Sequence, residues 1–158
     1  MPVIYTIGHS NRSIEEFVSL LKKHGITCLV DVRRFPTSKF EHFKKEKLAS
    51  RLARANVRYV YLGNLLGGFR QGGYEEFMKS EEFRAGLKKV VSLARKERLA
   101  IMCSELLWFK CHRRFISDEL CKLGFKVIHI VDKKRFYEHK VRSFTRVSLF
   151  FKRSVEKR

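Results

Sequence analysis

The chain has 158 residues, the usual length of one domain, and 44% of them are hydrophobic, which excludes an intrinsically disordered protein. Its 35 lysines and arginines outweigh 16 acidic residues and leave a formal net charge of +19. We therefore expect a nucleic acid or another phosphorylated ligand as its partner and no membrane partner, although a basic surface that only keeps the protein soluble is the plainer alternative.

The chain contains no stretch close to the roughly 20 apolar residues of a membrane span. Its first residues, MPVIYTIGHS, carry neither a basic leader nor an apolar signal region, so we expect a cytoplasmic protein. The four cysteines are too few and too irregularly spaced for a secreted disulfide framework, and we interpret them as reduced thiols. The oligomeric state and any cofactor are left open.

Short apolar runs alternate with longer amphipathic ones along the chain. Residues 3–7 (VIYTI) predict a buried strand. A helix follows from Ser13, which forms a capping box with Glu16, and it ends near Gly25. Further strands are predicted at 26–32, 57–62, 99–103 and 125–131, and further helices at 44–55, at 74–97 with a break near Ser80, and at 111–123.

This alternation predicts an α/β fold, because strands separated by helices pair in parallel through right-handed crossovers. We expect a single three-layer domain over residues 1–131, with a mainly parallel five-stranded sheet and helices on both faces. The strand order is left open. Residues 132–158 are rich in lysine and arginine, and we expect a basic C-terminal extension packed on the same domain.

Unusual polar residues gather where the predicted strands end. Open parallel sheets bind ligands beyond the carboxyl ends of their strands, because the loops converge there. One crevice would therefore collect side chains from four loops. The candidates for its chemistry are His9, Ser10, Asp31, Cys103, Glu105, Cys111 and His112, and those for binding substrate or an anion are Arg33, Arg113, Gly67 and Gly68.

The segment CSELLWFKCHRRF, from Cys103 to Phe115, allows three interpretations. Cys111 stands at the predicted start of a helix beside basic residues, which would stabilise a thiolate, with Cys103 as the second reactive thiol. Alternatively Cys103, Cys111 and His112 could bind a metal, although their spacing is unlike that of zinc modules. The third interpretation is that the cysteines are small buried hydrophobic residues, as we expect of Cys28 and Cys121.

Several motifs resemble one family. These are GHS at 8–10, DVRRFP at 31–36, the LGNLLGG loop at 62–68, and MCSE followed by CHRR at 102–114. In this order, from about Tyr5 to Val131, they resemble the family catalogued as domain of unknown function 488. The resemblance maps the signature positions onto the polar residues already selected at the strand ends, and it implies a site without naming a reaction.

The order of a strand with DVR, a strand ending in cysteine and an arginine that opens a helix is similar in layout to rhodanese sulfurtransferases and cysteine phosphatases. Those enzymes wrap an anion in a short loop between cysteine and arginine. Here the segment between Cys103 and Arg113 contains no glycine, so the same tight amide cradle cannot form.

Three functions remain open. The first is an enzyme acting on nucleic acid or a nucleotide, with Cys103 or Cys111 as nucleophile, Asp31 or Glu105 with a histidine as the acid and base, and Arg33 and Arg113 as the anion clamp. The second is a rhodanese-like cysteine enzyme that handles sulfur or phosphate in a small molecule. The third is a non-catalytic nucleic-acid-binding domain.

Overall fold

The computed structural model describes residues 2–141, so most of the predicted basic extension, residues 142–158, lies outside the described residues. The strands are β1 (Val3–Gly8), β2 (Cys28–Asp31), β3 (Arg58–Tyr61), β4 (Leu99–Cys103), β5 (Lys126–Ile130) and β6 (Phe136–Glu138). The helices are α1 (Ile14–Lys23), α2 (Lys45–Arg54), α3 (Gly63–Leu66), α4 (Tyr74–Phe77), α5 (Glu81–Ala94) and α6 (Arg113–Lys122), and short 3-10 helices, η1 and η2, lie at Glu41–Phe43 and Trp108–Lys110.

The helix boundaries follow the local signals in the sequence. The Ser13 hydroxyl accepts a hydrogen bond from the Glu16 N–H at 3.0 Å, and Gly25 adopts the left-handed φ of 70° that ends the first helical segment. Ser80 caps α5 in the same way, through the N–H of Phe83, so the predicted break between α4 and α5 is confirmed. The short helix α3 in the glycine-rich loop was not predicted.

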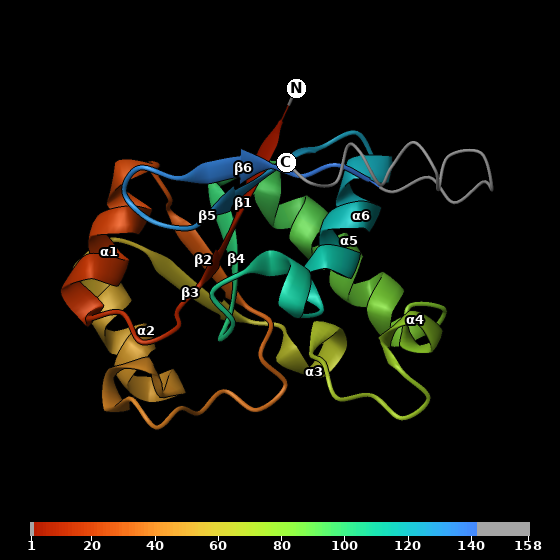
Figure 1. Cartoon of the computed structure of the whole chain (residues 1–158), viewed down its shortest axis with the longest axis horizontal. Coiled ribbons are helices and arrows are strands. Elements are labelled where there is room, and N and C mark those ends of the chain that lie inside the picture. Colours follow the sequence, from red (N-terminus) through yellow and green to blue (C-terminus); the bar gives the residue numbers. More distant parts are fainter. Residues whose placement is uncertain (1, 142–158) are drawn as a thin grey trace.

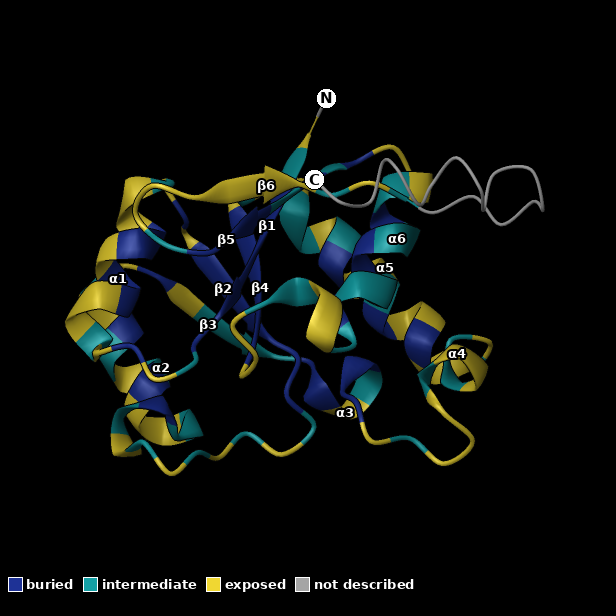
Figure 2. Ribbon diagram, in the orientation of Figure 1, coloured by how far each residue is buried: buried dark blue, intermediate teal, exposed yellow. Residues whose placement is uncertain are grey.

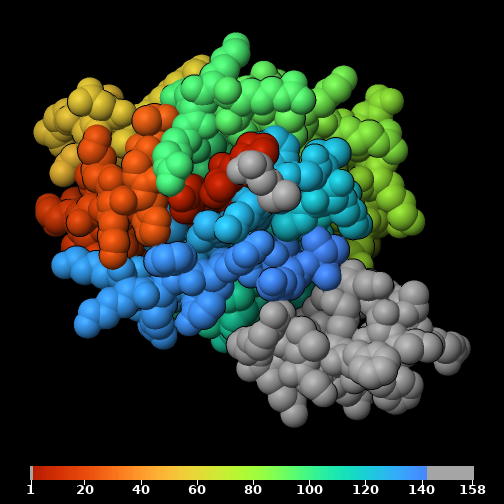
Figure 3. Space-filling model, turned by 90° about the horizontal axis from the view of Figure 1, so that it is seen from above, coloured from red at the N-terminus to blue at the C-terminus, as the bar shows by residue number. Residues whose placement is uncertain are grey.

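The sheet has the order β3-β2-β4-β1-β5-β6, and every pairing is parallel except that of β5 with β6. The α/β class and the mainly parallel sheet are confirmed, but the described part of the chain has six strands where the sequence predicted five. The sixth strand, β6, has three exposed residues and no buried face, so its sequence has no apolar pattern that would predict a strand. Figure 3 shows its segment as a blue band along one side of the molecule.

Helices cover both faces of the sheet (Figure 1). Phe17 of α1 and Leu48 of α2 pack on one face with Ile7 and Met102, while Ile116 of α6 packs on the other with Cys103. Figure 2 shows the buried strands between these two helical layers. None of the helices within residues 2–141 is both long and apolar enough to cross a lipid bilayer.

The adjacent strands β1 and β4 are the point where the chain changes direction across the sheet. The helix that follows β1 packs on one face and the helix that follows β4 packs on the other. In doubly wound sheets a ligand binds beyond the carboxyl ends of such a pair of strands. Gly8 and Cys103 are paired at those two ends, so the fold brings the predicted Gly-His-Ser and cysteine segments together.

Candidate thiolate site

The loops that follow β1 and β4 are joined by backbone hydrogen bonds. The N–H of His9 donates to the carbonyl of Cys103 at 2.9 Å, and the N–H of Ser10 donates to that of Ser104 at 3.0 Å. A Cβ atom on Gly8 would lie 1.7 Å from the Glu105 carbonyl oxygen, so only glycine permits this approach. The loop after β4 is therefore held against the end of β1.

The two cysteines of this segment lie side by side. The Sγ atoms of Cys103 and Cys111 are 2.9 Å apart, and the backbone N–H of Arg113 points at the Cys111 sulfur at 3.3 Å. Cys103 is buried, whereas Cys111 is partly exposed where α6 begins. The hydrogen bond from Cys103 lowers the pKa of the Cys111 thiol, with further lowering by His112 and Arg113, whereas burial raises the pKa of Cys103. The pair therefore favours one thiolate, on Cys111, with the proton on Cys103.

Arg113 is the largest fully buried side chain, 1% exposed, and it lies beneath this pair. Its Nη1 donates to the Thr6 hydroxyl at 3.0 Å, and its Nη2 donates to the carbonyl oxygens of Glu105 and Leu106 at 2.7 and 3.2 Å. The sequence suggested Arg113 as an anion clamp. In the structure its terminal nitrogens instead hold the loop after β4 in place, and its charge favours the thiolate of Cys111.

His112 and the two glycines form a second contact between loops. The His112 Nε2 atom is 2.9 Å from the Val32 carbonyl oxygen, and its Nδ1 would lie 3.1 Å from a Cβ atom on Gly68. A Cβ atom on Gly67 would lie 2.6 Å from the Cα of Arg34. Gly67 and Gly68 therefore let the backbone of their loop pack closely against other protein groups. The predicted role of these glycines, a close approach of the backbone to substrate, stays a prediction.

Asp31 and Arg33 form a buried ion pair at the end of β2. Arg33 Nε and Nη2 donate to the two oxygens of the Asp31 carboxylate at 2.9 and 2.8 Å, and the hydroxyl of Tyr59 donates to the same carboxylate at 2.5 Å. Arg33 Nη1 donates to the Phe43 carbonyl at 2.7 Å. Asp31 has no exposed surface, and the ion pair is a buried link between β2 and the loop after it.

His9 lies against this ion pair and is held neutral. Its Nδ1 donates to the Ser10 carbonyl at 2.9 Å, its Nε2 faces Arg33 Nη1 at 3.4 Å, and its ring stacks on Phe43 at 4.3 Å. Burial lowers the pKa of His9 to about 4, with the charge of Arg33 acting in the same direction. Both ring nitrogens face protein groups, which leaves neither for proton transfer to a substrate in this arrangement.

We expect His9 to make the protein less stable in acid. The unfolded histidine binds a proton below its ordinary pKa of about 6.5, and the folded one does so only near 4, so folding stability falls as the pH drops through this interval. Urea unfolding of the wild type and of His9→Asn at about pH 7, 6 and 5 should show a flatter pH dependence in the variant, in which asparagine can still donate to Ser10. Equal slopes would show that His9 does not titrate on unfolding.

Ser10 and Glu105 belong to the two joined loops that follow β1 and β4. Ser10 is partly exposed and adopts a left-handed φ of 48°. The side chain of Glu105 is exposed, and its carbonyl oxygen makes the contacts described above. Within residues 2–141 no group of three or more His, Cys, Asp or Glu side chains is arranged to hold a metal ion, and His112 faces a backbone carbonyl.

A chain of polar side chains behind Arg113 was missed by the sequence analysis. The Thr6 hydroxyl, which accepts from Arg113, also shares a hydrogen bond of 2.6 Å with His129 Nδ1. His129 Nε2 and His139 Nδ1 share a hydrogen bond at 2.8 Å, and His139 Nε2 donates to the Asp118 carboxylate at 2.6 Å. Thr6 and His129 occupy partner positions in two otherwise apolar strands, which is the signal that could have linked them.

Trp108 covers this chain of polar groups. Its ring stacks on that of His129, with centroids 4.5 Å apart and planes 4° from parallel. Burial lowers the pKa of His129 well below the usual value, so the ring under the tryptophan is neutral. The tryptophan thereby fixes the loop between Cys103 and Cys111 onto β5.

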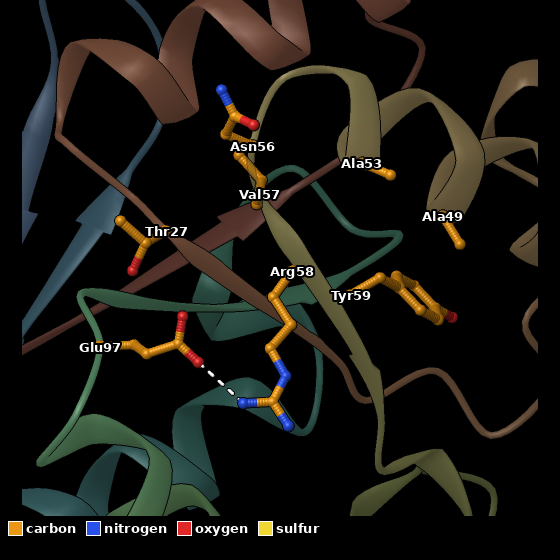
Figure 4. Close-up of a pocket in the computed structure, with 8 residues that line it drawn as sticks. All are labelled: Thr27, Ala49, Ala53, Asn56, Val57, Arg58, Tyr59 and Glu97. Carbon is orange, nitrogen blue, oxygen red and sulfur yellow. Dashed lines mark hydrogen bonds and ion pairs between the residues drawn. The ribbon is translucent and has the colours of Figure 1, made fainter.

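A hollow of about 540 Å³ lies beside β3, away from the cysteines. Figure 4 shows it, with Arg58 and Glu97 joined by an ion pair at 3.0 Å on one side and the small side chains of Ala49 and Ala53 on the other. Thr27, Arg58 and Glu97 stand at or before the starts of parallel strands. This hollow is therefore near the opposite end of the sheet from Cys103, and the candidate site does not include it.

Fold and site together define an α/β domain with a pair of neighbouring thiols at the carboxyl ends of its central strands. The chain belongs to the family described as domain of unknown function DUF488, whose model matches residues 13–73 and 67–120. The resemblance seen in the sequence motifs is thereby confirmed. No curated protein and no solved structure matches the chain significantly.

Proposed function

We propose that this protein is a cysteine-dependent enzyme whose nucleophile is the thiolate of Cys111, acting on a nucleic acid or a nucleotide. The observation that carries the proposal is the sulfur pair itself. Four features stabilise negative charge on Cys111: the neighbouring Cys103 thiol, the His112 side chain, the Arg113 N–H and the buried Arg113 guanidinium. Cys111 is also the more exposed sulfur of the two.

In this mechanism the two cysteines have different roles. The Cys111 sulfur attacks an electrophilic atom of the substrate and displaces a group bonded to that atom, which leaves with the electron pair of the broken bond, while Cys103 keeps its proton and donates a hydrogen bond. Arg113 is a positioning residue, because its guanidinium is engaged with Thr6 and two carbonyl groups. A reduced dithiol is maintained in a reducing compartment, which supports a cytoplasmic location.

The substrate class rests on charge. A formal net charge of +19 attracts polyanions, and phosphate-bearing polymers are the commonest ones in the cell. The rhodanese-like alternative fits less well, because the terminal nitrogens of Arg113 donate to protein groups and are not free to cradle an anion. The non-catalytic alternative predicts two unreactive thiols.

Alkylation of the native protein by iodoacetamide at varied pH, read by peptide mass mapping, tests the proposal. We expect Cys111 to be labelled at a pH well below about 8.5, the pKa of a free thiol. Cys121 is the internal control, because it is also partly buried but burial raises its pKa. In Cys103→Ala the pKa of Cys111 should rise toward that of a free thiol, since its principal hydrogen-bond donor is lost. Labelling of Cys111 and Cys121 at the same pH would remove the basis for a thiolate nucleophile.

A further inference from the structure

Two phenylalanines are exposed at the same end of the sheet as the cysteines. Phe69, in the loop after α3, is 84% exposed, and Phe35, in the loop after β2, is 61% exposed. Their ring centroids are 6.2 Å apart, so loops distant in sequence present the two rings together. Large aromatic side chains that remain in water are costly unless a partner covers them.

The backbone conformation of Phe69 adds a second cost. Its φ is 57°, in the left-handed region that bulky side chains rarely adopt. The turn that imposes this conformation is well fixed. Arg34 Nη1 donates to the Phe69 carbonyl, and Arg70 donates to the carbonyls of Gly67 and Asn64, both at 2.8 Å. A glycine or asparagine would adopt this turn more easily, so the ring is present despite the strain.

An arginine is adjacent in the sequence to each of the two phenylalanines. Arg34 precedes Phe35 in the sequence and its guanidinium carbon is 5.5 Å from the centre of that ring, while Arg70 directly follows Phe69. Lys110, immediately before Cys111 in the sequence, is exposed as well. Aromatic faces interleaved with cations are the combination that binds unpaired bases and their phosphates.

The loop that carries Phe69 contacts the segment that carries Cys111. Gly68, which precedes Phe69, packs against the ring of His112, the residue that follows Cys111. Gly67 packs against Arg34, which precedes Phe35. A ligand stacked on Phe69 therefore lies beside the loop that carries Cys111.

We propose that Phe35 and Phe69, with Arg34 between them, form a stacking platform that holds single-stranded nucleic acid next to Cys111. The inference rests on the proposed function, since it names the form in which the substrate is bound. A duplex is excluded because its bases are stacked on each other and their faces cannot reach the rings. A neutral apolar partner would leave the surrounding arginines without anionic partners.

The test is the affinity of the full chain for labelled oligonucleotides of about 12 units, measured by fluorescence anisotropy. The probes are oligo-dT, oligo-U and a DNA duplex of the same length. We expect both single strands to bind more tightly than the duplex. Phe69→Asn, which removes the ring and suits the left-handed turn, should weaken binding of the single strands by about 5- to 100-fold. Phe69→Trp should retain that binding.

The matched control is Phe136→Ala, which removes another exposed phenylalanine, 51% exposed, from β6. It should leave the affinity unchanged. Thermal unfolding gives a second readout: Phe69→Asn should be as stable as the wild type or more so, because the strain is relieved. Weaker binding with undiminished stability would exclude misfolding as the cause.

Other outcomes overturn the inference. Equal affinity for strand and duplex, unaffected by Phe69→Asn, would mean that charge alone binds the oligonucleotide. No binding to any probe would make the ring pair a surface for a protein partner or a second copy of the chain.

The two proposals fail separately. A reactive Cys111 in a protein that binds no single strand would overturn only the platform. Binding of single-stranded nucleic acid through Phe69, together with an unreactive Cys111, would support the platform and overturn the proposed enzymatic function. If both hold, oligo-dT should slow alkylation of Cys111 and leave that of Cys121 unchanged.

Discussion

Replacing Arg113 with methionine is expected to destabilise the protein by about 2–4 kcal/mol and to raise the pKa of Cys111. Methionine fills much of the same volume but provides no donor. The hydroxyl of Thr6 and the carbonyl oxygens of Glu105 and Leu106 lose their buried partner, and the Cys111 thiolate loses the nearest positive charge. Both effects arise because the side chain is 1% exposed.

Urea unfolding measures the first effect, and the pH profile of Cys111 alkylation measures the second. The control is Arg114→Met, which removes the same charge from the next position, where the side chain is only partly buried and lies over the ring of Phe115. Arg114→Met should have a much smaller effect on both readouts. An Arg113→Met protein as stable as the wild type would contradict the structural role assigned to the guanidinium.

The proximity of the loops after β1 and β4 could be predicted from the sequence, because only the ends of the two strands had to be located. Buried apolar runs such as 99–103 are visible in the sequence, and parallel pairing places their carboxyl ends together. Gly8 and Cys103 are indeed paired, and Cys111 lies beside Cys103. The order of the strands could not be predicted, because the direction of each crossover depends on which face of the sheet the connecting helix covers. The short exposed strand β6 gave no signal either.

The roles of individual residues could not be predicted in the same way. A charged residue near a strand end can face solvent or be buried with a partner, and the sequence does not distinguish the two. Arg33 and Arg113 were expected to bind an anion; in the structure Arg33 donates to Asp31 and Arg113 donates to carbonyl oxygens of the loop after β4. The polar chain from Thr6 to Asp118 depends on β6 bringing His139 to His129, and that strand was not foreseen.

The exposed rings of Phe35 and Phe69 were not selected from the sequence at all. Phe35 and Phe69 looked like ordinary loop residues, because nothing in the sequence separates a phenylalanine that packs from one that remains in water. Only the fold shows that the left-handed turn at Phe69 holds its ring beside Phe35. Strain and exposure at one residue are each unfavourable for stability, so their coincidence in a loop that contacts the Cys111 segment supports the proposed binding role.

Replacing Asp31 with asparagine should be among the most damaging single changes, at about 3–5 kcal/mol. The variant keeps the shape of the side chain but leaves the Arg33 guanidinium, 5% exposed, without its counter-charge. The loop after β2 depends on the same guanidinium through the Phe43 carbonyl, so this loop should loosen first. Amide hydrogen exchange should therefore accelerate at residues 33–43 before the rest of the domain unfolds.

Two comparisons separate this effect from a general sensitivity to lost charge. Glu119→Gln removes a carboxylate whose partner, Lys122, is 59% exposed, and should change stability little because solvent screens that pair. The double variant Asp31→Asn with Arg33→Met should recover part of the loss, since the uncompensated charge is gone. If the double variant is less stable than Asp31→Asn alone, hydrogen bonds from Arg33 to the loop outweigh its ion pair, and the buried link acts through Phe43 more than through Asp31.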